Sequence, residues 1–258
     1  RIRATFRRYV SAEVVDLLLD HPDLAQIDGG RRDVTVLFAD VRGFTAYAEA
    51  TPPEVVVRQL NKRLEVMAES VLLHGGMVDK FVGDGVMALF GAPLPAEDHA
   101  ERAVRAALHM LRQLEVEKKA AAGKREHLEI AVGIHTGVAI VGSIGSPRRK
   151  EYTAIGDAVN VAARLQELAP SGSIVASAET MEKIGVRLDM RVEPLGETQI
   201  RGRAEPVELY RLAPAPGSVD LDDLDELARP DDLDERDDRG HPDPAREPQG
   251  GDDPDKTE

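Results

Sequence analysis

Two runs of sequence set the architecture of this 258-residue chain: Asp33-Val-Thr-Val-Leu-Phe-Ala-Asp40 and Met77-Val-Asp-Lys-Phe-Val-Gly-Asp-Gly-Val-Met-Ala-Leu-Phe90. The first run predicts a buried strand that carries Asp40 at its end. In the second, apolar arms flank Gly83-Asp84-Gly85, a short turn typical of a β-hairpin. Neighbouring strands can bring Asp40 and Asp84 together, and converging carboxylates repel each other unless a cation lies between them. Because Mg²⁺ is commonly held by one or two carboxylates plus substrate phosphates, one hypothesis is a metal-dependent nucleotide site. The alternative is that Asp40 is a cap or a solvated turn residue and that Gly83-Asp84-Gly85 is an ordinary turn.

Periodicity predicts the elements around these runs. A helix is expected over 54–73, with apolar spacing at Val57, Leu60, Leu64, Met67 and Val71, and a second over 97–121. Beyond it we expect a long strand over 128–141, a mobile basic loop over 142–150 and a short strand near 151–153. The remaining elements are a helix over 158–168, a strand over 173–176, a helix over 178–184, and strands near 188–195 and 205–213. This order predicts an α+β fold with helices flanking a mostly antiparallel central sheet.

The two ends of the chain differ from its middle. Residues 1–30 predict a linker helix and loop, and the first residue is Arg, so we expect a segment of a longer protein with an upstream region. Residues 31–213 form the expected folded domain. Residues 214–258 are rich in Pro, Asp, Gly and Glu and poor in apolar residues, which predicts an acidic, disordered tail.

Charge and composition exclude several classes of protein. The tail holds 17 acidic and 5 basic residues, so only −2 of the net charge of −14 belongs to residues 1–213. A near-neutral domain with 3% aromatic residues does not favour nucleic-acid binding. There is no cysteine, which excludes disulfides and thiolate chemistry. Without an apolar membrane span or signal peptide, we expect a cytoplasmic domain, although upstream segments of a full-length protein could tether it to a membrane.

A second group of candidate residues lies in the run Tyr152-Thr-Ala-Ile-Gly-Asp-Ala-Val-Asn-Val-Ala-Ala-Arg164. Asn160 and Arg164 are four residues apart on the predicted helix, so they share a face. An amide beside a guanidinium suits an anion such as a phosphate. The alternative is an ordinary helix surface on which Arg164 pairs with Glu167 or Asp157.

Four ordered blocks together resemble the catalytic domain of the class III nucleotidyl (adenylate/guanylate) cyclases. The blocks are residues 34–45, 80–88, 133–137 and 152–164, and the resemblance extends from about residue 31 to 212. It implies a ferredoxin-like, palm-type fold. The run from Phe6 to Val15 also resembles the linker helix that often joins such domains to upstream sensors.

The resemblance implies a role for most of the candidate residues. Asp40, Asp84 and the carbonyl of Val41 would hold two divalent cations, Mg²⁺ or Mn²⁺. Asn160 would orient the ribose, and Arg164 would stabilise charge on the α-phosphate. A cation near the last hairpin, Arg203 in preference to Arg201, would hold the terminal phosphates. The remaining substrate contacts are Phe44, Thr45 and the base-reading residues Lys80 and Thr153.

Base choice favours ATP over GTP. Lys80 can donate to N1 of adenine but would face the N1–H donor of guanine, while Thr153 can accept from the 6-amino group of adenine. The family's active sites lie between two protomers, with Asp40 and Asp84 from one and Lys80, Thr153, Asn160 and Arg164 from the other. Because this chain carries both sets, we expect a homodimer with two equivalent sites.

The leading hypothesis is therefore an adenylate cyclase, with two alternatives left open. A guanylate cyclase would share the chemistry, but Lys80 disfavours it. A catalytically inactive, nucleotide-binding dimer module would be expected to lack a metal-binding Asp or the transition-state Arg, and all are present. The diguanylate cyclase signature is absent. His135 is expected to be a structural strand residue.

Overall fold

The computed structural model describes residues 29–120, 128–146, 149–184, 188–201 and 203–215. The expected linker helix over 1–20 and almost all of the expected acidic tail lie outside these residues. The elements in chain order are β1 (Gly30–Val41), α3 (Phe44–Ala50), α4 (Pro53–Leu73), β2 (Met77–Val82), β3 (Gly85–Phe90), α5 (His99–Ala120), β4 (Ile130–Ser146), β5 (Arg149–Ile155), α6 (Asp157–Leu168), β6 (Ser173–Ser177), α7 (Ala178–Glu182), β7 (Met190–Thr198) and β8 (Val207–Pro214).

One sheet organises the domain, in the strand order β2-β3-β1-β4-β6-β8-β7, with β5 paired to β4 outside this path. All pairings are antiparallel except that of β4 with β6. The expected α+β fold with a mostly antiparallel sheet flanked by helices is therefore confirmed. The 77–90 hairpin is confirmed as well, and its β3 arm pairs with β1.

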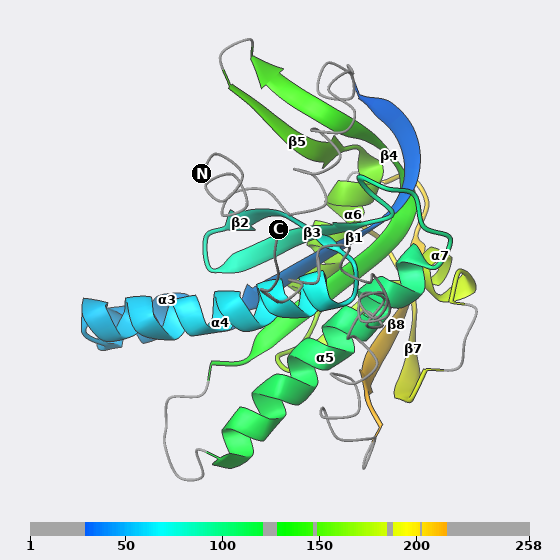
Figure 1. The fold of residues 1–258 in the computed structure, drawn as a ribbon. Helices are drawn as coiled ribbons and strands as arrows, with labels where there is room; N and C mark the ends of the chain where they lie inside the picture. The colour runs from blue at the N-terminus through cyan, green and yellow to red at the C-terminus, as the bar shows by residue number, and fades with distance from the viewer. Residues whose placement is uncertain (1–28, 121–127, 147–148, 185–187, 202, 216–258) are drawn as a thin grey trace, which may run out of the picture.

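Alternation along β1 assigns its side chains to the two faces of the sheet. Leu37, Ala39 and Val41 belong to the apolar core that includes buried residues of α4 and α5, whereas Val34 and Val36 pack in a second core with Ala158 and Ala162 of α6. In Figure 1, α4 and α5 accordingly lie on the face of the sheet opposite to α6. Gly133 on β4 permits the close approach of α6, because a Cβ there would collide with the backbone nitrogen of Gln166.

The first half of α4 extends beyond the sheet (Figure 1). Met67 and Val71 in its second half are buried, as their spacing suggests. Val57 belongs to the same apolar stripe but is 56% exposed in the single chain. The stripe therefore continues past the core that one copy of the domain provides.

The prediction of a mobile loop over 142–150 is wrong for its described residues. Residues 142–146 continue β4, and β5 begins at Arg149, so the two strands form a long hairpin that projects from the sheet (Figure 1). The sequence resembles a loop here because Gly142, Ser143 and Gly145 are poor strand formers. Ladder pairing from Ile140–Ile155 to Ser146–Arg149 overrides that weak local preference.

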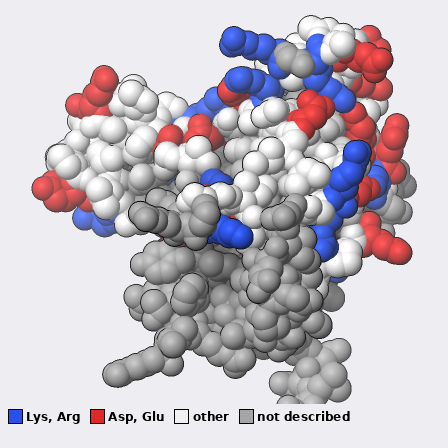
Figure 2. All heavy atoms as spheres, turned by 90° about the horizontal axis from the view of Figure 1, so that it is seen from above, with Lys and Arg blue, Asp and Glu red and all other residues white. Residues whose placement is uncertain are grey.

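Charges of both signs are distributed over the face shown in Figure 2, without a surface of one sign, in agreement with the near-neutral domain inferred from the sequence. No helix within the described residues is long and apolar enough to cross a membrane.

Candidate active site

The carboxylate pair, Asp40 and Asp84, forms where β1 ends beside the β2–β3 turn. Asp40 is paired in register with Gly85, so Asp84 lies next to it across the ladder. Burial raises the pKa of Asp40, and the negative charge of Asp84 raises it further, whereas Arg42 and the backbone N–H of Val41 oppose the rise. The structure therefore brings Asp40 and Asp84 close together, as predicted from the sequence.

Two glycines give the carboxylate pair its geometry. Gly83 has a φ of 62°, the left-handed conformation that the tight turn before Asp84 requires. At Gly85, a Cβ would lie 2.7 Å from Oδ1 of Asp40 and 2.5 Å from the carbonyl oxygen of Ala39. Gly85 therefore leaves open the space beside the Asp40 carboxylate that a side chain would fill.

The carboxylate pair fits a hard divalent cation. Burial and the neighbouring charge of Asp84 disfavour the anionic form of the Asp40 carboxylate, and a cation beside it would remove that cost. No cluster of three or more His, Cys, Asp or Glu side chains suitable for a metal exists among the described residues. Two carboxylates and the Val41 carbonyl would be an incomplete ligand set, of the kind that substrate phosphates and water complete around Mg²⁺.

Arg42 anchors the turn after β1 to the end of α6. Its guanidinium donates to the carbonyl oxygens of Gln166, Glu167 and Ala169 around the C-terminus of that helix. Arg42 thereby fixes the turn that joins Val41 to Phe44 and Thr45 at the start of α3. Phe44 packs partly buried against the core, and Thr45 is exposed.

The Lys80 cluster consists of Asp79, Lys80, Glu151 and Thr153, and it joins β2 to β5. The ammonium of Lys80 lies 3.1 Å from Oε2 of Glu151 and 3.5 Å from Oδ2 of Asp79. The hydroxyl of Thr153 donates to the same Oδ2 atom at 2.9 Å. Burial alone would lower the pKa of Lys80, but the two carboxylates raise it above its usual value, so Lys80 is held as a cation.

Asp79 and Glu151 are the members of the Lys80 cluster that the sequence analysis did not identify, and Asp79 is the buried one. The only signal was its position directly before Lys80, which in a regular strand would point it to the opposite face. The β2–β3 register shifts between Val78 and Lys80, so Asp79 is the extra residue of a β-bulge. A bulge re-aims side chains, and here Asp79 and Lys80 both reach toward β5.

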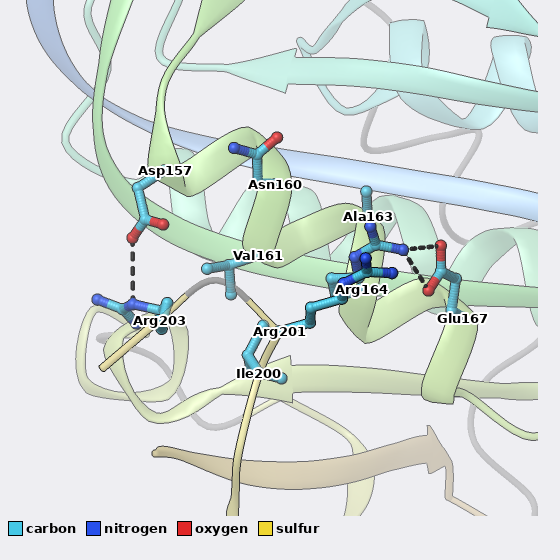
Figure 3. A pocket seen from close by; sticks show the side chains of 9 residues that line it. All are labelled: Asp157, Asn160, Val161, Ala163, Arg164, Glu167, Ile200, Arg201 and Arg203. Carbon is cyan, nitrogen blue, oxygen red and sulfur yellow. Dashed lines mark hydrogen bonds and ion pairs between the residues drawn. The ribbon is translucent and has the colours of Figure 1, made fainter. Parts of the chain in front are cut away.

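The α6 pocket is a cavity of about 540 Å³ next to helix α6. Its lining includes the predicted residues Asn160 and Arg164 as well as Arg201 and Arg203 (Figure 3). Asn160 is exposed, and Arg164 is bound to both carboxylate oxygens of Glu167 at 2.6 and 2.7 Å. The pairing with Glu167 considered in the sequence analysis thus occurs, but it lies within an arginine-rich pocket.

The two arginines near the last hairpin differ in their partners. Arg203 pairs with Asp157 at 3.1 Å and lies 3.8 Å from Glu179. Arg201 has no acidic partner among the described residues. Both arginines line the α6 pocket, so the geometry does not choose between them as the cation predicted near the last hairpin.

The lining of the α6 pocket contains none of Asp40, Asp84, Lys80 and Thr153. In the single chain the candidate residues therefore form three separate groups: the carboxylate pair, the Lys80 cluster and the lining of the α6 pocket. His135 is buried and shares a hydrogen bond with the Ser177 hydroxyl at 2.7 Å, in agreement with the structural strand position expected for it.

The family described as the adenylate and guanylate cyclase catalytic domain matches residues 29–214. The chain is 35% identical over 218 residues to "Adenylate cyclase 1" of Rhizobium meliloti (strain 1021), an alignment that covers 81% of this chain and 31% of that protein. Among solved structures, it resembles the adenylyl cyclase CyaB from P. aeruginosa with 34% identity and a TM-score of 0.68, over 75% of this chain and 100% of that one. It also resembles the guanylyl cyclase Cya2, with 36% identity and a TM-score of 0.67, over 76% of this chain and 100% of that one.

The chain therefore belongs to the class III nucleotidyl cyclase catalytic domain family. It spans about a third of the length of the Rhizobium relative. Relatives named for each of the two nucleotides occur at similar identity, so overall similarity does not choose the base.

Proposed function

We propose that this domain is an adenylate cyclase, which converts ATP to 3′,5′-cyclic AMP and pyrophosphate at sites shared between two copies of the chain. The observation that carries the proposal is the carboxylate pair at the end of β1, whose mutual repulsion a cation would relieve. In the reaction the ribose 3′-oxygen bonds to the α-phosphorus, the bond to the pyrophosphate oxygen breaks, and the hydroxyl proton is released.

Asp40, Asp84 and the carbonyl of Val41 would hold two divalent cations, Mg²⁺ or Mn²⁺. When bound, such ions supply a lowered pKa for the attacking hydroxyl and neutralise charge on the phosphates. The chain itself keeps the carboxylates in position through the Gly83 turn, the open space at Gly85 and the anchoring of Arg42. This division suits phosphoryl transfer, in which the protein mainly positions the reactants and stabilises charge.

The α6 pocket supplies the proposed contacts to ribose and phosphate. Asn160 is exposed on α6 and free to orient the ribose, with Arg164 one turn further along to bind the α-phosphate. The Arg164–Glu167 pair is half exposed, and such surface pairs contribute little stability, so a phosphate can replace Glu167. Arg203 is the proposed contact to the terminal phosphates, with Arg201 beside it, while Phe44 and Thr45 remain predicted contacts next to the carboxylate pair.

Lys80 and Thr153 support ATP as the substrate. The ammonium of Lys80 is a donor that suits N1 of adenine and opposes the N1–H of guanine. The proposal is supported by the contact that each of the two side chains makes with Asp79, and the family resemblance associates both positions with base reading.

A second copy of the chain would complete the site. The α6 pocket and the carboxylate pair do not share a lining in one chain, and a two-fold pair of identical chains can bring one set from each. Exposed apolar side chains are available to such a pair at Val57, Val138, Ile140 and Ile155. An upstream region that reorients the two copies could then switch the activity.

The experiment is to measure cyclic nucleotide formation by the purified chain from ATP and, separately, from GTP with Mn²⁺ or Mg²⁺. We expect cyclic AMP from ATP, and a loss on the order of 10³-fold in Asp84→Ala, because metal assistance is worth several kcal/mol. The control is Asp33→Asn, which removes an exposed acid of the same strand that pairs with Lys183. No product from a protein shown to be dimeric would reject catalysis and favour the inactive nucleotide-binding module.

A guanylate cyclase is the second candidate, favoured by the similarity to the guanylyl cyclase Cya2. Cyclic GMP as the main product would keep the carboxylate pair and the α6 pocket in their proposed roles. It would overturn the assignment of Lys80 and Thr153 to adenine.

A further inference from the structure

Asp79 is a buried carboxylate for which the proposed reaction has no use so far. Its side chain is 0% exposed, whereas that of its neighbour Lys80 is 38% exposed. Burial raises the pKa of Asp79, against the opposing effects of the Thr153 hydrogen bond and the Lys80 charge. A carboxylate is rarely buried this completely unless its partners require it.

The contacts of Asp79 are unequal between its two oxygens. Oδ2 accepts the hydroxyl hydrogen of Thr153 at 2.9 Å and lies 3.5 Å from the ammonium of Lys80. Oδ1 is buried and has no hydrogen-bond partner among the described residues. The bulge at Asp79 directs the carboxylate to this position, since a regular strand would direct it away from Lys80.

The Thr153 hydroxyl has one hydrogen and two lone pairs. When the hydrogen is donated to Asp79, only lone pairs remain for a ligand. An oxygen restricted in this way attracts the 6-amino group of adenine and repels the O6 carbonyl of guanine. The state of this one hydroxyl therefore discriminates between the two bases.

We propose that Asp79 is a positioning residue that sets nucleotide selectivity by holding the Thr153 hydroxyl as a hydrogen-bond acceptor toward the base. The proposal rests on the proposed function, because it takes Lys80 and Thr153 as base-reading residues. Asp79 also fixes the direction of the Lys80 ammonium, with Glu151 on its other side.

The simplest alternative is that Asp79 only ties β2 to β5. The two roles predict different results for Asp79→Asn, because the asparagine amide keeps the shape of the carboxylate but can donate hydrogen bonds as well as accept them. A structural tie would lower ATP and GTP use together. If Asp79 positions the Thr153 hydroxyl, the substitution allows that hydroxyl to donate to O6 of guanine. The kcat/KM for GTP should then rise relative to that for ATP.

The experiment compares kcat/KM for ATP and GTP in the parent chain, Asp79→Asn, Thr153→Val and the double variant. We expect the ATP:GTP ratio to fall about tenfold in each single variant without inverting, because Lys80 still opposes guanine N1–H. In the Thr153→Val background, Asp79→Asn should change the ratio by less than about threefold, since the hydroxyl through which it acts is gone. Glu117→Gln is the matched control, an acid paired with Arg63 and Lys62 away from this cluster, and its ratio should equal that of the parent.

An unchanged ratio in Asp79→Asn, or an equal change in both Thr153 backgrounds, would overturn the proposal. If Asp79→Asn does not fold, Thr153→Val decides, since a ratio that survives loss of the hydroxyl would also overturn it. If the parent makes no cyclic nucleotide, the proposed function fails separately. The same comparison is then made by displacing a ribose-labelled fluorescent adenine nucleotide with ATP or GTP. The parent should bind ATP more tightly than GTP, and the ratio of the two affinities should be about tenfold smaller in Asp79→Asn.

Discussion

The carboxylate pair and the Lys80 cluster both have acidic side chains in or beside strands of one sheet, but they differ in how the negative charge is compensated. Asp40 and Asp84 are neighbours of like charge, and burial together with the charge of Asp84 raises the pKa of Asp40. In the Lys80 cluster, a cation and a hydroxyl offset the charge of the buried Asp79. The first arrangement needs a charge from outside the chain, whereas the second is already organised before a ligand arrives.

The α6 pocket lies between these extremes, and after Asp84→Ala it gives the next largest expected effect. Arg164 has an acidic partner, but the pair is exposed and easily exchanged. If Arg164 turns from Glu167 to the α-phosphate, Arg164→Ala should lower kcat by about 10²–10³-fold, as expected for loss of a donor to transition-state charge. Arg102→Ala is the control, because Arg102 is an exposed helix arginine paired with Asp98. Equal, small losses in both variants would remove Arg164 from the reaction.

Reversing the polarity of the Lys80 cluster should reverse base choice. We expect Lys80→Glu with Thr153→Cys to lower the ATP:GTP ratio of kcat/KM by about 10²-fold, because the new carboxylate accepts from guanine N1–H. Total activity should fall as well, since the introduced carboxylate would lie beside those of Asp79 and Glu151. The ratio measured on both nucleotides is the readout. An unchanged ratio would mean that the base is read elsewhere.

The carboxylate pair should cost stability when no cation is present. Asp40→Asn removes a like charge, so we expect a higher melting temperature at pH 7. The sign follows from the raised pKa of Asp40, since folding is penalised wherever the group is ionised and the penalty disappears at pH values below 3.8. Relief of about 1 kcal/mol would raise the melting temperature by about 2–4 °C.

Divalent cations should reverse the order of the melting temperatures, so that the parent chain becomes more stable than Asp40→Asn. Mg²⁺ or Mn²⁺ should raise the melting temperature of the parent chain and of Asp33→Asn, with much less effect on Asp40→Asn, because a ligand that binds only the folded state stabilises it. Equal stabilisation of all three proteins would mean that the cation binds elsewhere.

A pair of histidines shows a third way to place like groups together, and it gives the smallest expected effect. The rings of His74 and His109 are 5.5 Å apart, and burial followed by the charge of His109 lowers the pKa of His74 to about 4. The folded protein thus keeps His74 neutral while the unfolded chain takes up a proton below pH 6.5. Stability should fall as the pH decreases from about 6.5 to 4.

Replacement of His74 tests this assignment. The melting temperature of His74→Gln should fall less between pH 7 and pH 5 than that of the parent chain. An identical pH dependence in the two proteins would show that other groups cause the acid sensitivity.

Much of this arrangement could be predicted from the sequence. The helices α4, α5 and α6 follow from apolar periodicity, and the 77–90 hairpin follows from its Gly-Asp-Gly turn. The convergence of Asp40 and Asp84 could be predicted because both lie at strand ends or turns. The cyclase family could be recognised from four short blocks, and the comparisons confirm it.

The rest depends on interactions between residues distant in the chain. The β4–β5 hairpin forms through ladder pairing in a segment whose glycines suggest a loop. The role of Asp79 depends on a bulge that appears only when β2 is paired with β3, and no local pattern in Val78-Asp79-Lys80 indicates it. The ion pair between Arg203 and Asp157 joins residues from α6 and the loop before β8, so spacing alone could not reveal it.

The most direct test of the account is the product ratio formed by the purified chain from an equimolar mixture of ATP and GTP with Mn²⁺. We expect cyclic AMP as the main product, because Lys80 and the Thr153 hydroxyl held by Asp79 would both favour adenine. Cyclic GMP as the main product would contradict this assignment, as would a dimeric protein that forms neither product.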